Sequence, residues 1–140
     1  MLSLESLPRP VVRAVTLTQR FQKFLLVGAI GLAVNQGALF ALVGVAGVTL
    51  AIASPIAILL SMAVTFLCNE RWTWHDRSRG RLTHRAMLYG SINYGGLLIN
   101  WLILISLERM GLNYLVANLI GAAVAAVWNF SLNNALTWRE

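Results

Sequence analysis

The sequence predicts an all-α integral membrane protein with four transmembrane helices, arranged as two tandem helical hairpins of the same orientation. Three observations support this fold class: few charged residues, four long apolar stretches, and a motif that recurs 64 residues further along the chain. Of the 140 residues, 58% are hydrophobic and 11% are charged, whereas a soluble domain carries about 25% charged residues. A chain of this length forms one domain at most.

Each apolar stretch has the length of a membrane-spanning helix. The stretches run over about 24–45, 50–68, 87–107 and 112–136, and none contains Lys, Arg, Asp or Glu. A span needs about 20 mostly apolar residues, and a helix satisfies its own backbone groups in lipid. Only a few residues separate the first span from the second and the third from the fourth. We therefore expect two tight hairpins joined by the longest loop, at about 69–86.

The stretch before the first span is basic. We expect residues 1–22 to form a cytoplasmic N-terminal arm, within which Val11–Lys23 suits a short amphipathic helix. The first span is longer than a signal-peptide core and no clear small-residue cleavage site follows it, so we expect it to be retained. The membrane domain is expected over 23–140, with one repeat at about 24–74 and the next at about 89–138.

The basic residues predict the orientation. Ten of the eleven flank the spans on one side, and only Arg109 lies on the other. The ten are Arg9, Arg13, Arg20, Lys23, Arg71, Arg77, Arg79, Arg81, Arg85 and Arg139. Because Lys and Arg concentrate in cytoplasmic segments, both termini are predicted to be cytoplasmic. The basic composition is thereby explained by orientation, and we expect no nucleic-acid partner.

The recurring motif defines the repeat. Residues Thr65–Trp74 match Asn129–Trp138 at Phe, Asn, Thr and Trp. The first and third spans align at an offset of 65, which pairs Phe24 with Tyr89, Gly31 with Gly96 and Asn35 with Asn100. Each repeat crosses the membrane twice, so the repeats share an orientation. Both Asn-x-x-x-Thr-Trp motifs should then lie at cytoplasmic helix ends.

Polar side chains inside the spans have two interpretations. Asparagines are found in several spans, at Asn35, Asn93, Asn100, Asn129 and Asn133, and Asn69 follows the second span. Facing lipid is costly for an amide, so we expect them to point into the bundle. Helix–helix hydrogen bonds, worth about 0.6 kcal/mol each, explain any single asparagine as well as a polar path does. Their paired placement favours a polar path for some of them.

The sequence lacks the residue patterns of a disulfide, a metal site, a proton-coupled transporter and an enzyme active site. Cys68 is the one cysteine, and His75 and His84 have no ligand cluster around them, so neither a disulfide nor a metal is expected. We expect no cofactor. No span contains a carboxylate, which disfavours a proton-coupled multidrug exporter. No nucleophile stands with a base and an orienting acid, so we expect no enzyme active site.

Three segments carry a family resemblance. They are Phe24-Leu-Leu-Val-Gly28, Asn69-Glu-Arg71-Trp72-Thr73-Trp74 and the weaker echo ending in Thr137-Trp138. With these segments the chain resembles the GtrA-like family over about Phe21 to Trp138. The resemblance implies a small four-helix protein of the bacterial cytoplasmic (inner) membrane. It also implies translocation of a polyprenyl-phosphate-linked sugar that a membrane glycosyltransferase then uses in cell-envelope polysaccharide synthesis.

With that resemblance, the residues suggest roles. Arg71 would attract the lipid phosphate, although Ala135 stands at its position in the second motif. The tryptophans would pack against the sugar or hold the rim at headgroup depth; they are Trp72, Trp74 and Trp138. The asparagines would bind sugar hydroxyls or line the path; they are Asn35, Asn69, Asn100, Asn129 and Asn133. We expect a homodimer with a groove between protomers. The alternative is a non-transporting accessory subunit that anchors a glycosyltransferase through small-residue faces and the 77–85 loop.

Overall fold

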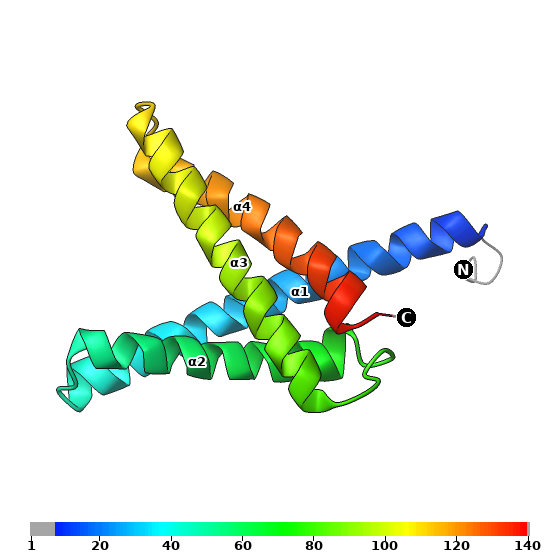
Figure 1. Cartoon of the computed structure of the whole chain (residues 1–140), viewed down its shortest axis with the longest axis horizontal. Coiled ribbons are helices and arrows are strands. Elements are labelled where there is room, and N and C mark those ends of the chain that lie inside the picture. The colour runs from blue at the N-terminus through cyan, green and yellow to red at the C-terminus, as the bar shows by residue number, and fades with distance from the viewer. Residues whose placement is uncertain (1–7, 140) are drawn as a thin grey trace. The chain divides into compact units, whose positions relative to one another are not determined.

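A computed structural model describes residues 8–139, apart from the side chains at positions 50, 114 and 115. Over this range the chain is helical with turns and contains no strand (Figure 1). It divides into two compact units, residues 1–75 and 76–140, and each is a helical hairpin. Residues 1–7 of the expected N-terminal arm lie outside the described residues, as does residue 140.

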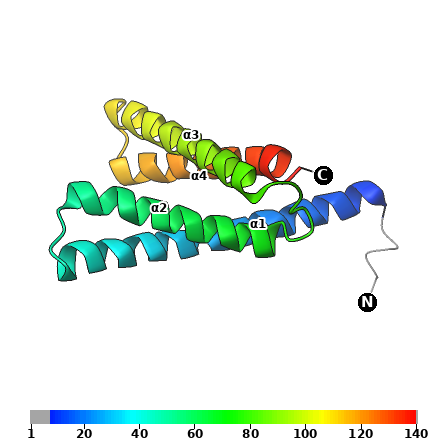
Figure 2. The ribbon, with the colours of Figure 1, turned by 60° about the horizontal axis from the view of Figure 1, so that its bottom comes forward.

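The first unit pairs two long helices. α1 runs over Arg9–Leu39 and continues as the π-helical segment η2, Phe40–Val45. α2, Leu50–Cys68, continues as η3, Asn69–Thr73. α1 and α2 lie side by side in both views (Figures 1 and 2), and the turn between them contains Gly47 at φ +68°. The segment Val11–Lys23 is helical, and it runs into the first span without a break.

The second unit has the same plan. α3 runs over Leu82–Arg109, and α4, Tyr114–Leu132, continues as η4, Asn133–Thr137. α3 and α4 pack along each other, and the turn between them contains Gly111 at φ +91°. Four helices in the described part of the chain are long and apolar enough to cross a membrane. The prediction of an all-α, multi-pass membrane protein is thus confirmed.

The outer surface of the helices is apolar. Large aliphatic side chains are exposed on every span, among them Leu32 on α1, Leu59 on α2, Leu102 on α3 and Leu119 on α4. Such a continuous apolar surface suits contact with lipid rather than water. Within each hairpin the buried positions include small residues, such as Ala53, Ala57 and Ala117, which let two helices approach closely without a hydrophobic driving force in lipid.

Gly121 on α4 lies close to the backbone of α3. A methyl group on Gly121 would lie 2.8 Å from the backbone carbonyl oxygen of Asn100 on α3, and backbone cannot rotate away from a clash. We therefore predict that Gly121→Ala lowers the unfolding free energy by about 1–3 kcal/mol, measured by denaturant titration in detergent micelles. The matched control is Gly28→Ala, because nothing lies within 4 Å of a methyl group there. Equal stability of the two variants would contradict this packing account.

Candidate functional site

In the first hairpin, α2 ends in a wide turn that begins at Asn69. The backbone N–H of Trp74 donates to the carbonyl oxygen of Asn69, five residues earlier, at 2.9 Å. The Asn69 side chain is buried, and its Oδ1 accepts a hydrogen bond of 2.8 Å from Thr73 Oγ1. A π-type turn is rare and often marks a functional position in a helix. The Asn-x-x-x-Thr spacing therefore locks an amide inside the end of this hairpin.

The second hairpin contains the same turn. The N–H of Trp138 donates to the carbonyl oxygen of Asn133 at 2.9 Å, and Thr137 Oγ1 donates to Asn133 Oδ1 at 2.7 Å. Asn133 has no exposed surface. Its Nδ2 is buried with no hydrogen-bond acceptor among the described residues. Both hairpins thus end in the same kind of turn, and the second turn leaves a buried donor.

The tryptophans divide into two kinds. Trp74 is fully buried, and its ring meets Phe24 edge to face with centroids 6.0 Å apart. Trp138 is also fully buried and meets Tyr89 in the same way at 5.7 Å. Trp72 instead is 43% exposed, with Lys23 Nζ 5.8 Å from its ring centroid. Of the three, Trp72 is the one whose ring is accessible to a ligand.

Two buried arginines were not among the predicted site residues. Arg20 lies one helical turn before Phe24, and Arg85 lies one turn before Tyr89; they are 7% and 6% exposed. Nη1 of Arg85 donates to the carbonyl oxygens of Arg79 and Gly80, the latter at 2.9 Å. The signal was present in the sequence, because the offset of 65 that pairs Phe24 with Tyr89 also pairs the arginines.

The hairpins differ in charge beside the matched asparagines. Glu70 follows Asn69 and is buried at 9% exposure, whereas Asn134 stands at the equivalent position of the second hairpin. Asn134 Oδ1 accepts a hydrogen bond of 3.1 Å from Nη1 of Arg77. Arg71, the predicted phosphate-attracting residue, is exposed. The first hairpin thus has a buried carboxylate where the second has a neutral amide.

The remaining asparagines lie along the spans. Asn100 Nδ2 donates to Asn118 Oδ1 at 3.4 Å across the second hairpin, and Asn129 lies against Gly96, where a methyl group would overlap its amide. The Oδ1 atoms of Asn100 and Asn129 are buried without a hydrogen-bond donor among the described residues. Asn35 is half-buried on α1. The Asn100 amide N–H therefore bonds across the helix pair, whereas the amide oxygens of Asn100 and Asn129 have no donor among the described residues.

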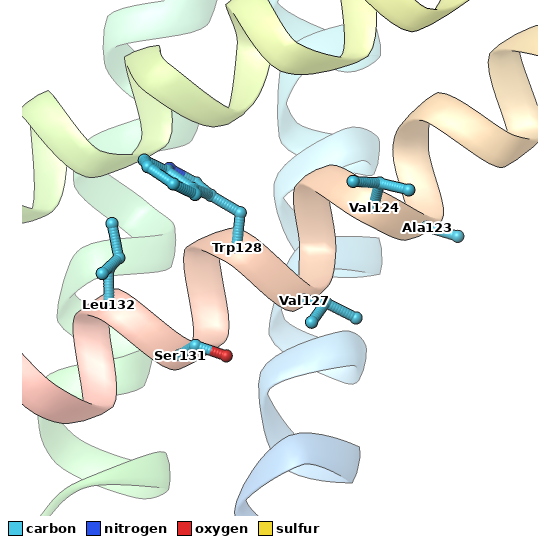
Figure 3. Close-up of a pocket in the computed structure, with 6 residues that line it drawn as sticks. All are labelled: Ala123, Val124, Val127, Trp128, Ser131 and Leu132. Carbon is cyan, nitrogen blue, oxygen red and sulfur yellow. The ribbon is translucent and has the colours of Figure 1, made fainter.

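A shallow hollow of about 540 Å³ runs along α4 (Figure 3). Its lining is almost wholly apolar and consists of Ala123, Val124, Val127, Trp128, Ser131 and Leu132. The indole N–H of Trp128 donates to the carbonyl oxygen of Ile92 on α3 at 3.3 Å. The hollow therefore suits a lipid chain better than a sugar. In the described part of the chain, no three His, Cys, Asp or Glu side chains gather as a metal site.

Comparison with known proteins identifies the family. The sequence pattern described as the GtrA/DPMS transmembrane domain matches residues 23–139. The chain belongs to the GtrA/DPMS transmembrane-domain family. It is also 32% identical over 119 residues to a dolichol-phosphate mannosyltransferase of Pyrococcus furiosus. That match covers 85% of this chain and 34% of the mannosyltransferase, so the chain spans about a third of its relative's length.

Proposed function

We propose that this protein translocates a polyprenyl-phosphate-linked sugar across the bacterial cytoplasmic membrane for cell-surface polysaccharide synthesis or modification. One observation carries the proposal: each hairpin buries an Asn–Thr pair and an arginine at one end of an otherwise apolar span. Ionisable and polar groups at such positions are costly and usually mark a pathway or binding site. The family, and a relative named for dolichol phosphate and mannose, support a lipid-linked sugar as the substrate.

The exposed rim of the first hairpin would meet the substrate first. Arg71 is exposed, and Lys23 lies near the ring of the exposed Trp72. A guanidinium matches phosphate oxygens in shape and charge, so Arg71 attracts the lipid phosphate. The indole face of Trp72 packs against the sugar. Trp74 and Trp138 hold the rim in place from inside the hairpins.

The asparagines would form hydrogen bonds with the sugar as it crosses the membrane. Amide side chains both donate and accept hydrogen bonds, as sugar hydroxyls do. Asn69 and Asn133 act at the hairpin ends, and Asn129, Asn100 and Asn35 act further along the spans. The prenyl tail stays in lipid throughout. Because four helices enclose little space, we place the path in a groove between the protomers of a homodimer.

The membrane potential suffices to drive this movement outward. Moving one negative charge out of the cell gains about 2.3 kcal/mol per 100 mV of inside-negative potential. No coupling ion is then required, which agrees with spans that contain no carboxylate over residues 24–45, 50–68, 87–107 and 112–136. The chain itself performs no covalent step in this proposal. A separate membrane glycosyltransferase would use the sugar on the outer side.

A second candidate function follows from the relative. The similarity to about a third of a mannosyltransferase favours a membrane region that accompanies a glycosyltransferase without transporting anything. The small-residue helix faces and the 77–85 loop would then bind the enzyme. The two candidates are separated by transport measured with this protein alone. Co-purification with an enzyme, together with no lipid movement by the pure chain, would favour the accessory role.

The decisive experiment uses liposomes that contain only the purified protein. A labelled polyprenyl-phosphate-sugar is placed in both leaflets, and its accessibility to an external reagent is followed. Protein-dependent access to the inner-leaflet pool supports translocation. No movement above that in empty liposomes, with the protein folded, rules out translocation by this chain and leaves the accessory role.

Replacing Arg71 tests the proposed phosphate attraction. We predict that Arg71→Ala slows translocation by about tenfold or more, since a hydrogen bond to a charged group contributes about 1.5–3 kcal/mol. Arg13→Ala is the matched control, because Arg13 is an exposed arginine on α1 away from the motif. Equal rates for the two variants and the unaltered protein would remove Arg71 from the site.

A further inference from the structure

We infer that Lys23 and Trp72 form a headgroup-binding site on the first hairpin, in which the Lys23 ammonium group binds the phosphate and the Trp72 ring packs against the sugar. We call these two residues the Lys23–Trp72 pair. The inference rests on the proposed function for the identity of the lipid-linked sugar, and it adds Lys23 as the residue that holds the phosphate. Arg71 keeps its role in the initial attraction.

Lys23 and Trp72 lie together at one end of the first hairpin. Lys23 is on α1, and Trp72 is in η3, which follows α2 and packs against α1. Nζ of Lys23 lies 5.8 Å from the centroid of the Trp72 ring, within the range of a cation–π contact. Trp72 is 43% exposed and Lys23 is half-buried. A ligand can therefore reach a cation and an aromatic ring at one place.

The ring contact positions the Lys23 ammonium group but provides no oxygen for its hydrogen bonds. An ammonium group has three N–H donors, whereas a ring face offers a quadrupole rather than a lone pair. Within the described residues, the Lys23 side chain makes no ion pair in addition to this contact. A charge-assisted hydrogen bond to a phosphate oxygen is stronger than a cation–π contact at a partly exposed site. The Lys23 ammonium group is therefore free to bind a phosphate.

The second hairpin has leucines where the first has the Lys23–Trp72 pair. The offset of 65 pairs Lys23 with Leu88, and the offset of 64 pairs Trp72 with Leu136. Leu136 is 50% exposed, so this position faces outward in both hairpins. The edge-to-face ring pairs inside the hairpins are nevertheless present in both. Because a hairpin of this plan keeps its interior packing with leucines at both positions, packing does not explain the cation and the exposed ring.

The position of the pair suits a lipid headgroup. Both residues lie just outside the apolar stretches over 24–45 and 50–68, where Lys and Trp side chains reach headgroup depth. A lysine ammonium group binds phosphate as a compact point charge, and an indole ring packs against the apolar face of a sugar. The ligand class is therefore a membrane lipid whose phosphate carries a sugar, rather than a phosphate alone.

Equilibrium binding to the full chain in nanodiscs tests the site with two tritiated probes, decaprenyl phosphate and decaprenyl-phosphate-mannose. The mannosyl group follows the mannosyltransferase to which the chain is similar, and decaprenol, which lacks a phosphate, is the control for binding of the tail. We expect Lys23→Gln to lower the affinity for both probes by about tenfold or more. Lys23→Arg keeps a charged donor, so it should bind both probes within about threefold of the unaltered protein.

A second variant tests the aromatic ring. Trp72→Leu introduces the residue of the second hairpin, and we expect it to lower the affinity for decaprenyl-phosphate-mannose by about threefold or more. Its affinity for decaprenyl phosphate should be unaltered, because that probe offers no sugar to the ring. Two matched controls should leave both affinities unaltered: Arg13→Gln, which removes an exposed charge elsewhere on α1, and Leu136→Ala in the second hairpin.

Melting temperatures check that the variants fold. If Lys23→Gln does not fold, Trp72→Leu with the two probes still tests the site, since an exposed ring is replaced there. Unaltered binding by Lys23→Gln, or an equal loss in Arg13→Gln, would overturn the phosphate role of Lys23. An equal loss of both probes in Trp72→Leu would overturn the sugar contact. Displacement by phosphatidylglycerol or inorganic phosphate, as effective as that by unlabelled decaprenyl-phosphate-mannose, would overturn recognition of a lipid-linked sugar.

The outcome is distinct from that of the proposed function, because binding is measured without movement across the bilayer. If the unaltered protein binds the probes through the Lys23–Trp72 pair but moves no lipid in liposomes, the translocation proposal fails and the site stands. If the unaltered protein translocates the lipid and Lys23→Gln does so at the same rate, the site is wrong and the function stands.

Discussion

Trp138→Ala is expected to lower the unfolding free energy of the protein by about 3–5 kcal/mol, the range for truncating a buried aromatic side chain. Trp138 has no exposed surface, and its ring packs edge to face on Tyr89 with centroids 5.7 Å apart. Such a ring pair adds about 0.5–1.5 kcal/mol beyond burial. Denaturant titration in micelles, followed by far-ultraviolet circular dichroism, measures the loss.

The two other tryptophans of the repeated motif provide the comparison. Trp74→Ala should cost a similar amount, because Trp74 is equally buried and packs on Phe24. Trp72→Ala should cost about 1 kcal/mol or less, as expected for the truncation of a largely exposed side chain. A large loss for Trp72→Ala, or a small one for Trp138→Ala, would show that interior packing does not explain the motif's final tryptophan.

The low charge and the four long apolar stretches predicted the all-α membrane fold, because a long apolar stretch in lipid has few alternatives to a helix. The stretch predicted at 50–68 coincides with α2, Leu50–Cys68. The start of α1 was harder to locate. The apolar pattern begins at Phe24, but the helix begins at Arg9. No proline or glycine lies between Pro10 and Gly28, so nothing in that interval interrupts the helix once it has started.

The repeat located part of the candidate site. It singled out Asn69 and Asn133, which the structure buries in matched turns. The sequence predicted that both Asn-x-x-x-Thr-Trp motifs lie at helix ends, but not that a threonine hydroxyl would donate to the oxygen of each amide. That bond depends on side-chain geometry within the turn, which the spacing does not specify.

The sequence did not predict that Arg20 and Arg85 are buried. Arg20 and Arg85 were counted among the residues that orient the chain in the membrane, and that role accounts for their charge without requiring burial. Burial depends on which face of the helix each occupies, and this face is set by contact with the partner helix.

Asn133→Leu is expected to slow translocation in liposomes by roughly tenfold, the effect of losing a hydrogen bond of about 1.5 kcal/mol to a sugar hydroxyl. Leucine has the same number and branching of side-chain heavy atoms as asparagine, but it removes both the oxygen that accepts from Thr137 and the buried Nδ2 donor. The variant thus combines a structural loss with the loss of a ligand contact. Leucine alone does not tell the two apart.

Thr137→Val separates these two losses. Valine keeps the shape of threonine and removes only the hydroxyl that donates to Asn133 Oδ1 at 2.7 Å. A side-chain hydrogen bond inside a membrane protein contributes about 0.6 kcal/mol on average. We therefore expect Thr137→Val to translocate within about threefold of the unaltered rate. Should Thr137→Val be as slow as Asn133→Leu, the amide would serve only to hold the turn. A fast Thr137→Val beside a slow Asn133→Leu means that the buried amide contacts the substrate, because the hydroxyl bond then accounts for little of the loss.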